Sequence, residues 1–144
     1  MNMKIVIASD HAGYALKEKI KQYLAEKSYE IIDCGTDSEA SCDYPVFAKA
    51  LCKNITDGNA ELGILVCGTG IGMSMAANKV KGIRAAVCSD YFSTKFTRAH
   101  NDANVMCIGA RVMGEGLCME LVDMFLSTPF EGGKHLRRIN MFEE

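Results

Sequence analysis

Several features that would assign this 144-residue chain to a protein class are missing from it. No Cys-x-x-Cys pair occurs, which excludes zinc ribbons and thioredoxin-like redox pairs. No apolar run approaches the roughly 18 residues that a membrane span needs. The formal net charge of −2 gives no support for nucleic-acid binding. The first residues lack the apolar region of a signal peptide, so we expect a cytoplasmic protein with no membrane or nucleic-acid partner.

The chain does contain seven cysteines, an odd number at irregular spacings that is a poor basis for a disulfide framework. Unpaired cysteines indicate a reducing compartment, in which most serve as small buried apolar residues. A chain of this length can bury a core without disulfides or a structural metal. We therefore expect one domain over residues 1–144, and we ask which cysteine, if any, carries chemistry.

Short apolar runs alternate with segments of helical spacing along the chain. Apolar residues recur at helical spacing from Leu16, Phe47 and Leu117, and Pro129 ends the last of these segments. Repeated strand–helix alternation predicts an α/β fold with a parallel sheet and helices on both faces. The runs expected to form the five strands are residues 4–8, 29–34, 62–67, 83–88 and 104–108.

Two strand-to-helix turns hold the residues that suit a binding site. Ser-Asp-His-Ala-Gly at residues 9–13 follows the first strand, and Cys-Gly-Thr-Gly-Ile-Gly at residues 67–72 follows the third. Ligands of open parallel sheets bind at the carboxyl ends of the strands, where the strand order reverses. In a flavodoxin-like order the first and third strands are neighbours, so we expect both turns to face one crevice.

The glycine-rich turn at residues 67–72 is expected to bind an anion. Its glycines let the backbone approach a ligand, and a helix predicted over residues 71–79 points free N–H groups into the turn. The anion is a phosphate or an oxyanion that develops during reaction, unless the glycines only form a tight turn. Met73 breaks the dinucleotide-binding pattern G-x-G-x-x-G. Asp90, 22 residues after Gly68, does stand at the distance of the acid that holds the ribose in such sites.

Cys67 differs from the other cysteines because it ends a strand directly before this helix. The positive end of a helix dipole favours a thiolate, which is a nucleophile or a base. Cys34 and Cys88 also end strands, but no glycine-rich helix start follows them, so we expect both to pack in the core.

Histidine and basic residues later in the chain extend the candidate site. His100 stands in a polar group before the fifth strand and is a candidate acid with a near-neutral pKa. Basic residues after the fifth strand and in the tail either hold a phosphate or form a solvated basic patch. They are Arg111, Lys134, Arg137 and Arg138.

Seven short motifs in order cover essentially the whole chain: residues 9–13, 43–45, 67–72, 76–79, 82–85, 100–105 and 131–135. Together they resemble the B-type ribose-5-phosphate isomerases, the family that also contains galactose-6-phosphate isomerase subunits. The resemblance implies a Rossmann-like three-layer α/β/α sandwich without metal or cofactor. It also implies a homodimer or dimer of dimers with sites shared between subunits, the tail from about residue 130 to 144 reaching the partner.

The activity that the resemblance implies is interconversion of D-ribose 5-phosphate and D-ribulose 5-phosphate through an enediolate, in the pentose phosphate pathway. In that family Cys67 corresponds to the base, and His100 assists opening of the sugar ring with Thr69 nearby. The substrate-binding positions that the resemblance implies are Asp10, His11, Tyr44, Gly68, Gly70, Ile71, Gly72, Asn101, Arg111, Lys134 and Arg138.

Two positions depart from the family pattern. Met73 stands where one branch has a catalytic carboxylate, which indicates the cysteine branch. Lys134 stands where arginine is frequent, and lysine keeps the charge but loses bidentate geometry. The alternatives are an isomerase of a six-carbon sugar phosphate, such as allose 6-phosphate or galactose 6-phosphate, a non-catalytic sugar-phosphate or nucleotide binding module, and a cysteine hydrolase that acts by acyl transfer.

Overall fold

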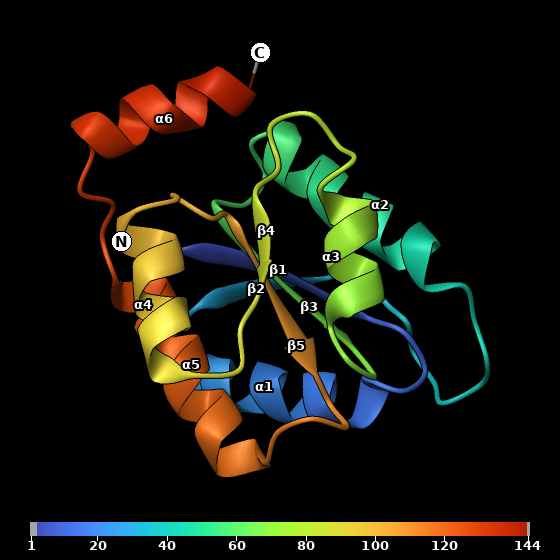
Figure 1. The fold of residues 1–144 in the computed structure, drawn as a ribbon. Helices are drawn as coiled ribbons and strands as arrows, with labels where there is room; N and C mark the ends of the chain where they lie inside the picture. The colour runs from blue at the N-terminus through green and yellow to red at the C-terminus, as the bar shows by residue number, and fades with distance from the viewer. Residues whose placement is uncertain (1–2, 144) are drawn as a thin grey trace.

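A computed structural model describes residues 3–143, which fold around one parallel sheet with helices on both faces (Figure 1). The strands lie in the order β2-β1-β3-β5-β4, so the predicted α/β fold with a five-stranded parallel sheet is confirmed. The strands are β1 (Lys4–Ser9), β2 (Glu30–Asp33), β3 (Leu62–Cys67), β4 (Ala85–Val87) and β5 (Val105–Gly109). The helices are α1 (Tyr14–Glu26), α2 (Tyr44–Thr56), α3 (Ile71–Ala77), α4 (Tyr91–Ala99), α5 (Glu115–Ser127) and α6 (Lys134–Phe142).

Every predicted strand is present, with ends that differ from the predicted ones by at most two residues. The third strand begins and ends where its apolar run does. The fourth is the shortest, because the side chain of Asn104 accepts the backbone N–H of Arg84 at 2.8 Å and pairing begins only at Ala85. A side-chain acceptor that replaces a strand partner in this way delays the start of the ladder.

The strand order places the carboxyl ends of β1, β3 and β5 side by side. β1 pairs with β3, and Ser9 lies opposite Val66, so the order reverses between these two strands as expected. The other half of the sheet differs from the flavodoxin-like order, because β5 lies between β3 and β4. Gly109 at the end of β5 therefore lies opposite Cys67 at the end of β3.

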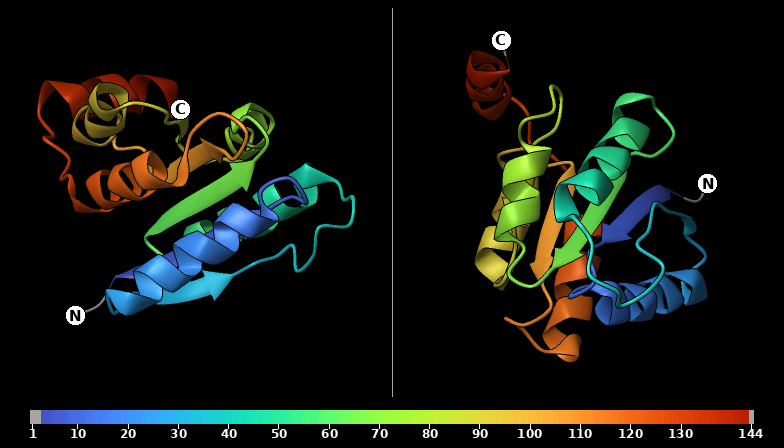
Figure 2. Two further views of the ribbon diagram at one scale, coloured as in Figure 1. Left: turned by 90° about the horizontal axis from the view of Figure 1, so that it is seen from below. Right: turned by 90° about the vertical axis from the view of Figure 1, so that its right-hand side faces the viewer.

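Alternate residues of the central strands face two different helical layers. In β3, Ile64 and Val66 face the core formed with α1 and α5, whereas Leu65 and Cys67 face the core formed with α2 and α3. Figure 2 shows the two layers on either side of the sheet. Burial on both faces explains why these strands are continuous apolar runs in the sequence.

The apolar stripes predicted from the sequence lie in α1, α2 and α5, where Ile20, Leu51 and Phe125 are fully buried. The helix expected over residues 71–79 is α3, which ends two residues earlier. Its end is set by Asn78, whose side chain bonds both the N–H and the carbonyl of Ala85.

Two helices, α4 and α6, have no counterpart among the predicted stripes. The tail from about residue 130 was expected only as a basic extension, yet α6 forms from Lys134 and buries Ile139, while residue 144 lies outside the described part. Helix α6 follows two glycines with positive φ, Gly132 and Gly133, which redirect the chain. Among the helices of residues 3–143, none is long and apolar enough to cross a bilayer.

Candidate active site

Cys67 lies at the carboxyl end of β3 and is 5% exposed. Its Sγ accepts a hydrogen bond from the backbone N–H of Gly70 at 3.1 Å. The neighbouring Thr69 is exposed, and its hydroxyl accepts the N–H of Ile71 at 3.2 Å. The turn thus holds a thiol and a hydroxyl among backbone donors at the start of α3, where oriented N–H groups favour negative charge.

Close backbone contacts leave no room for a side chain at two glycines around this turn. Gly70 has a φ of +82°, and a Cβ there would lie 3.1 Å from the carbonyl carbon of Ile108. On the β5 side, a Cβ at Gly109 would lie 2.7 Å from the backbone of Thr69. The turn after β3 therefore rests directly on the end of β5, and a side chain at either position would separate them.

The turn after β1 places Asp10 and His11 beside the same edge of the sheet. The Asp10 carboxylate is buried and accepts the N–H of Gly13 at 3.0 Å, while the Asp10 N–H donates to the carbonyl of Val66. His11 Nδ1 accepts the backbone N–H of Cys42 at 3.3 Å. In a neutral ring this leaves the proton on Nε2, which is then a donor for an anion.

Tyr44 and Arg111 reach the glycine-rich turn from two further elements. A Cβ on Gly72 would lie 2.9 Å from the ring of Tyr44, so the first residue of α2 packs against this turn. The N–H of Arg111 donates to the carbonyl of Gly68 at 3.0 Å, and its guanidinium lies over the same glycine. The turns after β1 and β3 therefore lie side by side, and Arg111 after β5 adds a cation beside them, whereas a crevice shared by both turns stays a prediction.

Five cysteines outside this turn have a raised pKa. Burial raises the pKa of Cys52 and Cys88 to about 11, and that of Cys118 to about 12. Burial also raises the pKa of Cys34 and Cys107. These side chains are thiols at neutral pH, as expected for core cysteines, and all seven cysteines are free.

The remaining predicted site residues form a second group, at the other edge of the sheet. His100 follows α4, Asn101 is adjacent to it, and Lys134 and Arg138 lie in α6. The ring of His100 stacks on that of His135, with centroids 4.0 Å apart and 11° between the planes. Both rings approach the carboxylate of Glu131 at 3.6 Å.

A single chain does not bring the two groups together. The carbonyl of Asn104, four residues after His100, bonds Gly63 at the start of β3, whereas Cys67 ends that strand. The four steps from Gly63 to Cys67 span roughly 13 Å at about 3.3 Å each. The left view of Figure 2 shows α6 where the strands begin, while the β3 arrow points away from it toward α3.

Asp90, which the sequence offered as a ribose-binding acid, has a structural role instead. It is the N-cap of α4, and its carboxylate accepts the N–H of Ser93 at 2.7 Å. This backbone hydrogen bond lowers the pKa of Asp90. A carboxylate occupied as a helix cap does not support the dinucleotide interpretation.

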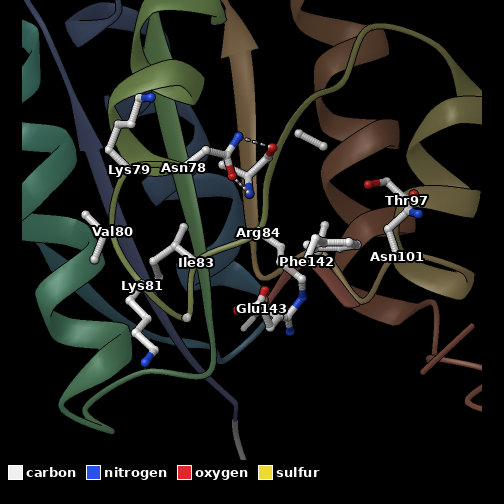
Figure 3. Close-up of a pocket in the computed structure, with 14 residues that line it drawn as sticks. Asn78, Lys79, Val80, Lys81, Ile83, Arg84, Thr97, Asn101, Phe142 and Glu143 are labelled. Atoms are coloured by element: carbon white, nitrogen blue, oxygen red, sulfur yellow. Dashed lines mark hydrogen bonds and ion pairs between the residues drawn. The ribbon is translucent and has the colours of Figure 1, made fainter. Parts of the chain in front are cut away.

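A cavity of ≈ 700 Å³ lies at the same edge of the sheet as His100, and its wall includes Asn101 and Arg84 (Figure 3). Arg84 bonds the carboxylate of Asp102 at 3.2 Å, and Arg98 bonds it at 3.0 Å. Asp102 has a φ of +48°, so these two arginines stabilise an uncommon backbone conformation next to Asn101. Asp102 thus ties the His100 segment to both β4 and α4.

Sequence reasoning missed Glu131 and His135 as members of this group. Glu131 precedes α6 and is separated from it by two glycines with positive φ, so helical spacing gave no signal that it lies beside His135. The approach of both to His100 was not readable from the sequence, because the backbone bond from Glu131 N–H to the carbonyl of Ala99 joins segments 32 residues apart.

Comparisons with known proteins agree with this architecture. The ribose-5-phosphate isomerase B of Escherichia coli (strain K12) is 45% identical over 136 residues, which are 94% of this chain and 91% of that protein. The crystal structure of a ribose 5-phosphate isomerase from Thermotoga maritima has a TM-score of 0.97 at 50% identity and 99% coverage of both chains. A Mycoplasma genitalium ribose-5-phosphate isomerase B with bound ribulose-5-phosphate has a TM-score of 0.93 at 41% identity, covering 99% of this chain and 95% of that one.

The fold is that of the ribose-5-phosphate isomerases of the B type, which act on a sugar phosphate. The family profile described as ribose/galactose isomerase matches residues 5–142, and the chain belongs to this family. Membership sets aside the non-catalytic binding module and the cysteine hydrolase, because the relatives are isomerases.

Proposed function

We propose that the protein interconverts D-ribose 5-phosphate and D-ribulose 5-phosphate through an enediolate, with Cys67 as the base. The observation that carries this proposal is the hydrogen bond from Gly70 N–H to Sγ of Cys67, within a turn that also faces Asp10 and Arg111. Support also comes from the relatives named ribose-5-phosphate isomerase B, one of which holds ribulose-5-phosphate.

The chemistry requires a base that moves one proton between adjacent carbons. The Cys67 thiolate would take the proton from C2 of the open-chain aldose and return it to C1, while the hydroxyl proton passes from O2 to O1. Negative charge on the enediolate oxygens would be stabilised by backbone N–H groups of residues 68–72. Of the cysteines, Cys67 is the one that ends a strand within this turn.

The phosphate needs cations at a fixed distance from the reacting carbons. His11 and Arg111 lie at the same edge as Cys67 and would hold it from this chain, with Asp10 on sugar hydroxyls. We infer that His100, Asn101, Lys134 and Arg138 act in the site of a second copy, because a chain cannot bring them to its own Cys67. The functional unit in this proposal is a homodimer or a dimer of dimers.

Two further expectations belong to this proposal. The seven free thiols suit a reducing compartment, which supports a cytoplasmic location. No metal or cofactor is required, because proton transfer and charge stabilisation are both assigned to groups of the chain. A six-carbon sugar phosphate is the alternative substrate, since the family description names both ribose and galactose.

The experiment that tests the proposal is turnover of ribose 5-phosphate in D₂O, followed by NMR. We expect ribulose 5-phosphate to form with solvent deuterium at the transferred position. Cys67→Ala should retain binding of the sugar phosphate and lose turnover by at least about 10³-fold. Cys118→Ala is the matched control, because this buried thiol lies in the core on the opposite face of the sheet and should leave turnover intact.

A panel of allose 6-phosphate and galactose 6-phosphate separates the substrates. Faster turnover of a hexose phosphate than of ribose 5-phosphate would replace the pentose assignment. Full activity in Cys67→Ala would contradict the base assignment.

A further inference from the structure

We propose that His100, Glu131 and His135 form a binding site for one divalent transition-metal ion of the zinc type, and that the bound ion inhibits the isomerase. The inhibition rests on the role of His100 in the proposed function, whereas the binding does not. The site lies at the edge of the sheet where α4 ends and α6 begins, opposite the edge that holds Cys67.

The three side chains converge closely enough for one ion. One ligand atom of each residue lies within 4.8 Å of the other two, and the two histidine–carboxylate distances are both 3.6 Å. Zinc bonds nitrogen and oxygen at about 2.0–2.1 Å, so tetrahedral ligand atoms lie roughly 3.3 Å apart. The side chains of Glu131 and His100 are 54% and 38% exposed, so rotation of these two would bring the ligand atoms to that spacing.

The backbone already holds the ligands in place. The N–H of Glu131 donates to the carbonyl of Ala99 at 3.0 Å, which fixes Glu131 beside the end of α4. The N–H of His135 donates to the carbonyl of Gly132 at 3.1 Å, in the first turn of α6. Binding therefore does not require ordering of a long segment, and little conformational entropy opposes it.

The ligand types fit zinc and related ions. Two imidazoles and one carboxylate are a known zinc ligand set, and three protein ligands leave a position for water. Lys134 and Arg138 repel a cation, so we expect weaker affinity than that of a structural zinc site.

Inhibition is expected because Nε2 of His100 would serve both as a metal ligand and in opening of the sugar ring. Nε2 of His100 faces Glu131, and a metal bonded there would occupy the lone pair that proton transfer during ring opening needs. The ion would thus lower kcat of the isomerase by occupying His100, at a distance from the Cys67 of its own chain.

The binding test is calorimetric titration of metal-free Cys67→Ala protein with ZnCl₂, which removes the active-site thiol as a competing ligand. We expect one ion per chain, and Glu131→Gln and His135→Gln should each weaken binding at least tenfold. His11→Gln is the matched control, because this histidine faces Cys42 at the opposite edge. Loss of binding in His11→Gln, unchanged binding in both site variants, or no saturable binding would overturn the site.

The inhibition test is turnover of ribose 5-phosphate by the unmodified protein with and without ZnCl₂. We expect inhibition that a chelator reverses, and we expect His135→Gln to need at least tenfold more zinc. Equal sensitivity of His135→Gln and the unmodified protein would overturn the inhibition. A protein that is inactive without zinc would overturn the proposed function, while the titration would still decide whether the site exists.

Discussion

Gly70 shows how a single residue supports the proposed catalytic turn. Its φ of +82° lies in the left-handed region, and the carbonyl carbon of Ile108 leaves 3.1 Å for a Cβ. The N–H of the same residue donates to Sγ of Cys67. Backbone conformation and the position of the thiol are therefore coupled at this glycine, which the sequence indicated only as part of a glycine-rich turn.

Gly70→Ala should lower both stability and turnover. A left-handed alanine costs about 1–2 kcal/mol, and the added methyl group would displace the turn that holds the thiol. Gly58→Ala is the control, because Gly58 has the same φ of +82° with nothing within 4 Å of its Cβ. Urea unfolding should show losses in both variants, and kinetics should show a loss of kcat in Gly70→Ala alone. Full turnover in Gly70→Ala would contradict the coupling.

At the level of secondary-structure elements, Lys17 links helix α1 to strand β2. Its side chain is 1% exposed, and its ammonium donates to the carboxylate of Asp33 at 2.8 Å and to the carbonyl of Thr36 at 2.6 Å. Burial tends to raise the pKa of Asp33, but hydrogen bonds from Lys17 and Lys21 outweigh it and hold the pKa below its usual range. A buried charge with these partners is costly to leave unpaired.

Asp33→Asn should therefore lower the free energy of unfolding at pH 7 by about 3 kcal/mol. Because the pKa of Asp33 is lowered by folding, its stabilisation is present above the unfolded value of about 3.9 and is lost as the pH falls through the folded value. Unfolding in urea across that acidic range should show a smaller pH dependence in the variant than in the unmodified protein. Asp57→Asn, which breaks the exposed Lys53 pair, should cost under about 0.5 kcal/mol. Equal losses in the two variants would refute the assignment.

At the scale of the whole molecule, the decisive feature is the separation of Cys67 from His100. One chain places them at opposite edges of the sheet, so the proposed site, which uses both residues, would need two copies. In a dimer with two-fold symmetry, a contact between one residue of the first copy and another residue of the second occurs twice. A pair of chains would therefore hold two complete sites. This agrees with the shared site that the sequence resemblance implied, and it stays a prediction until subunits are mixed.

Mixing of inactive Cys67→Ala and His100→Gln chains by refolding should restore activity. Random pairing makes half of the dimers hybrid, and each hybrid has one intact site, so about a quarter of the full activity should return. Mixing of Cys67→Ala with Arg111→Ala is the control, because both residues lie at one edge and no site would be intact. Hybrids without activity would show that the site is not shared.

The sequence predicted most of the fold and the position of the turn at Cys67 because the relevant signals are local. Continuous apolar runs located all five strands, and the glycines after Cys67 marked the turn for which anion binding is proposed. Helix α4 was missed because the residues that it buries, Thr94 and Ala99, form no stripe of large apolar side chains, and α6 because only Ile139 of its residues is buried. The cap at Asp90 resembled a ligand-binding acid because spacing alone does not reveal a hydrogen bond to Ser93 N–H.

By itself, the sequence determined which segments form strands, which turn holds the thiol, and which residue types suit a sugar phosphate. Those features depend on neighbours within a few residues, through apolar burial and backbone conformation. The tertiary structure alone decided that β5 lies between β3 and β4, which brings Arg111 onto Gly68. It also decided that His100, Glu131 and His135 meet at the opposite edge. Such contacts depend on pairing between distant segments, which local pattern does not encode.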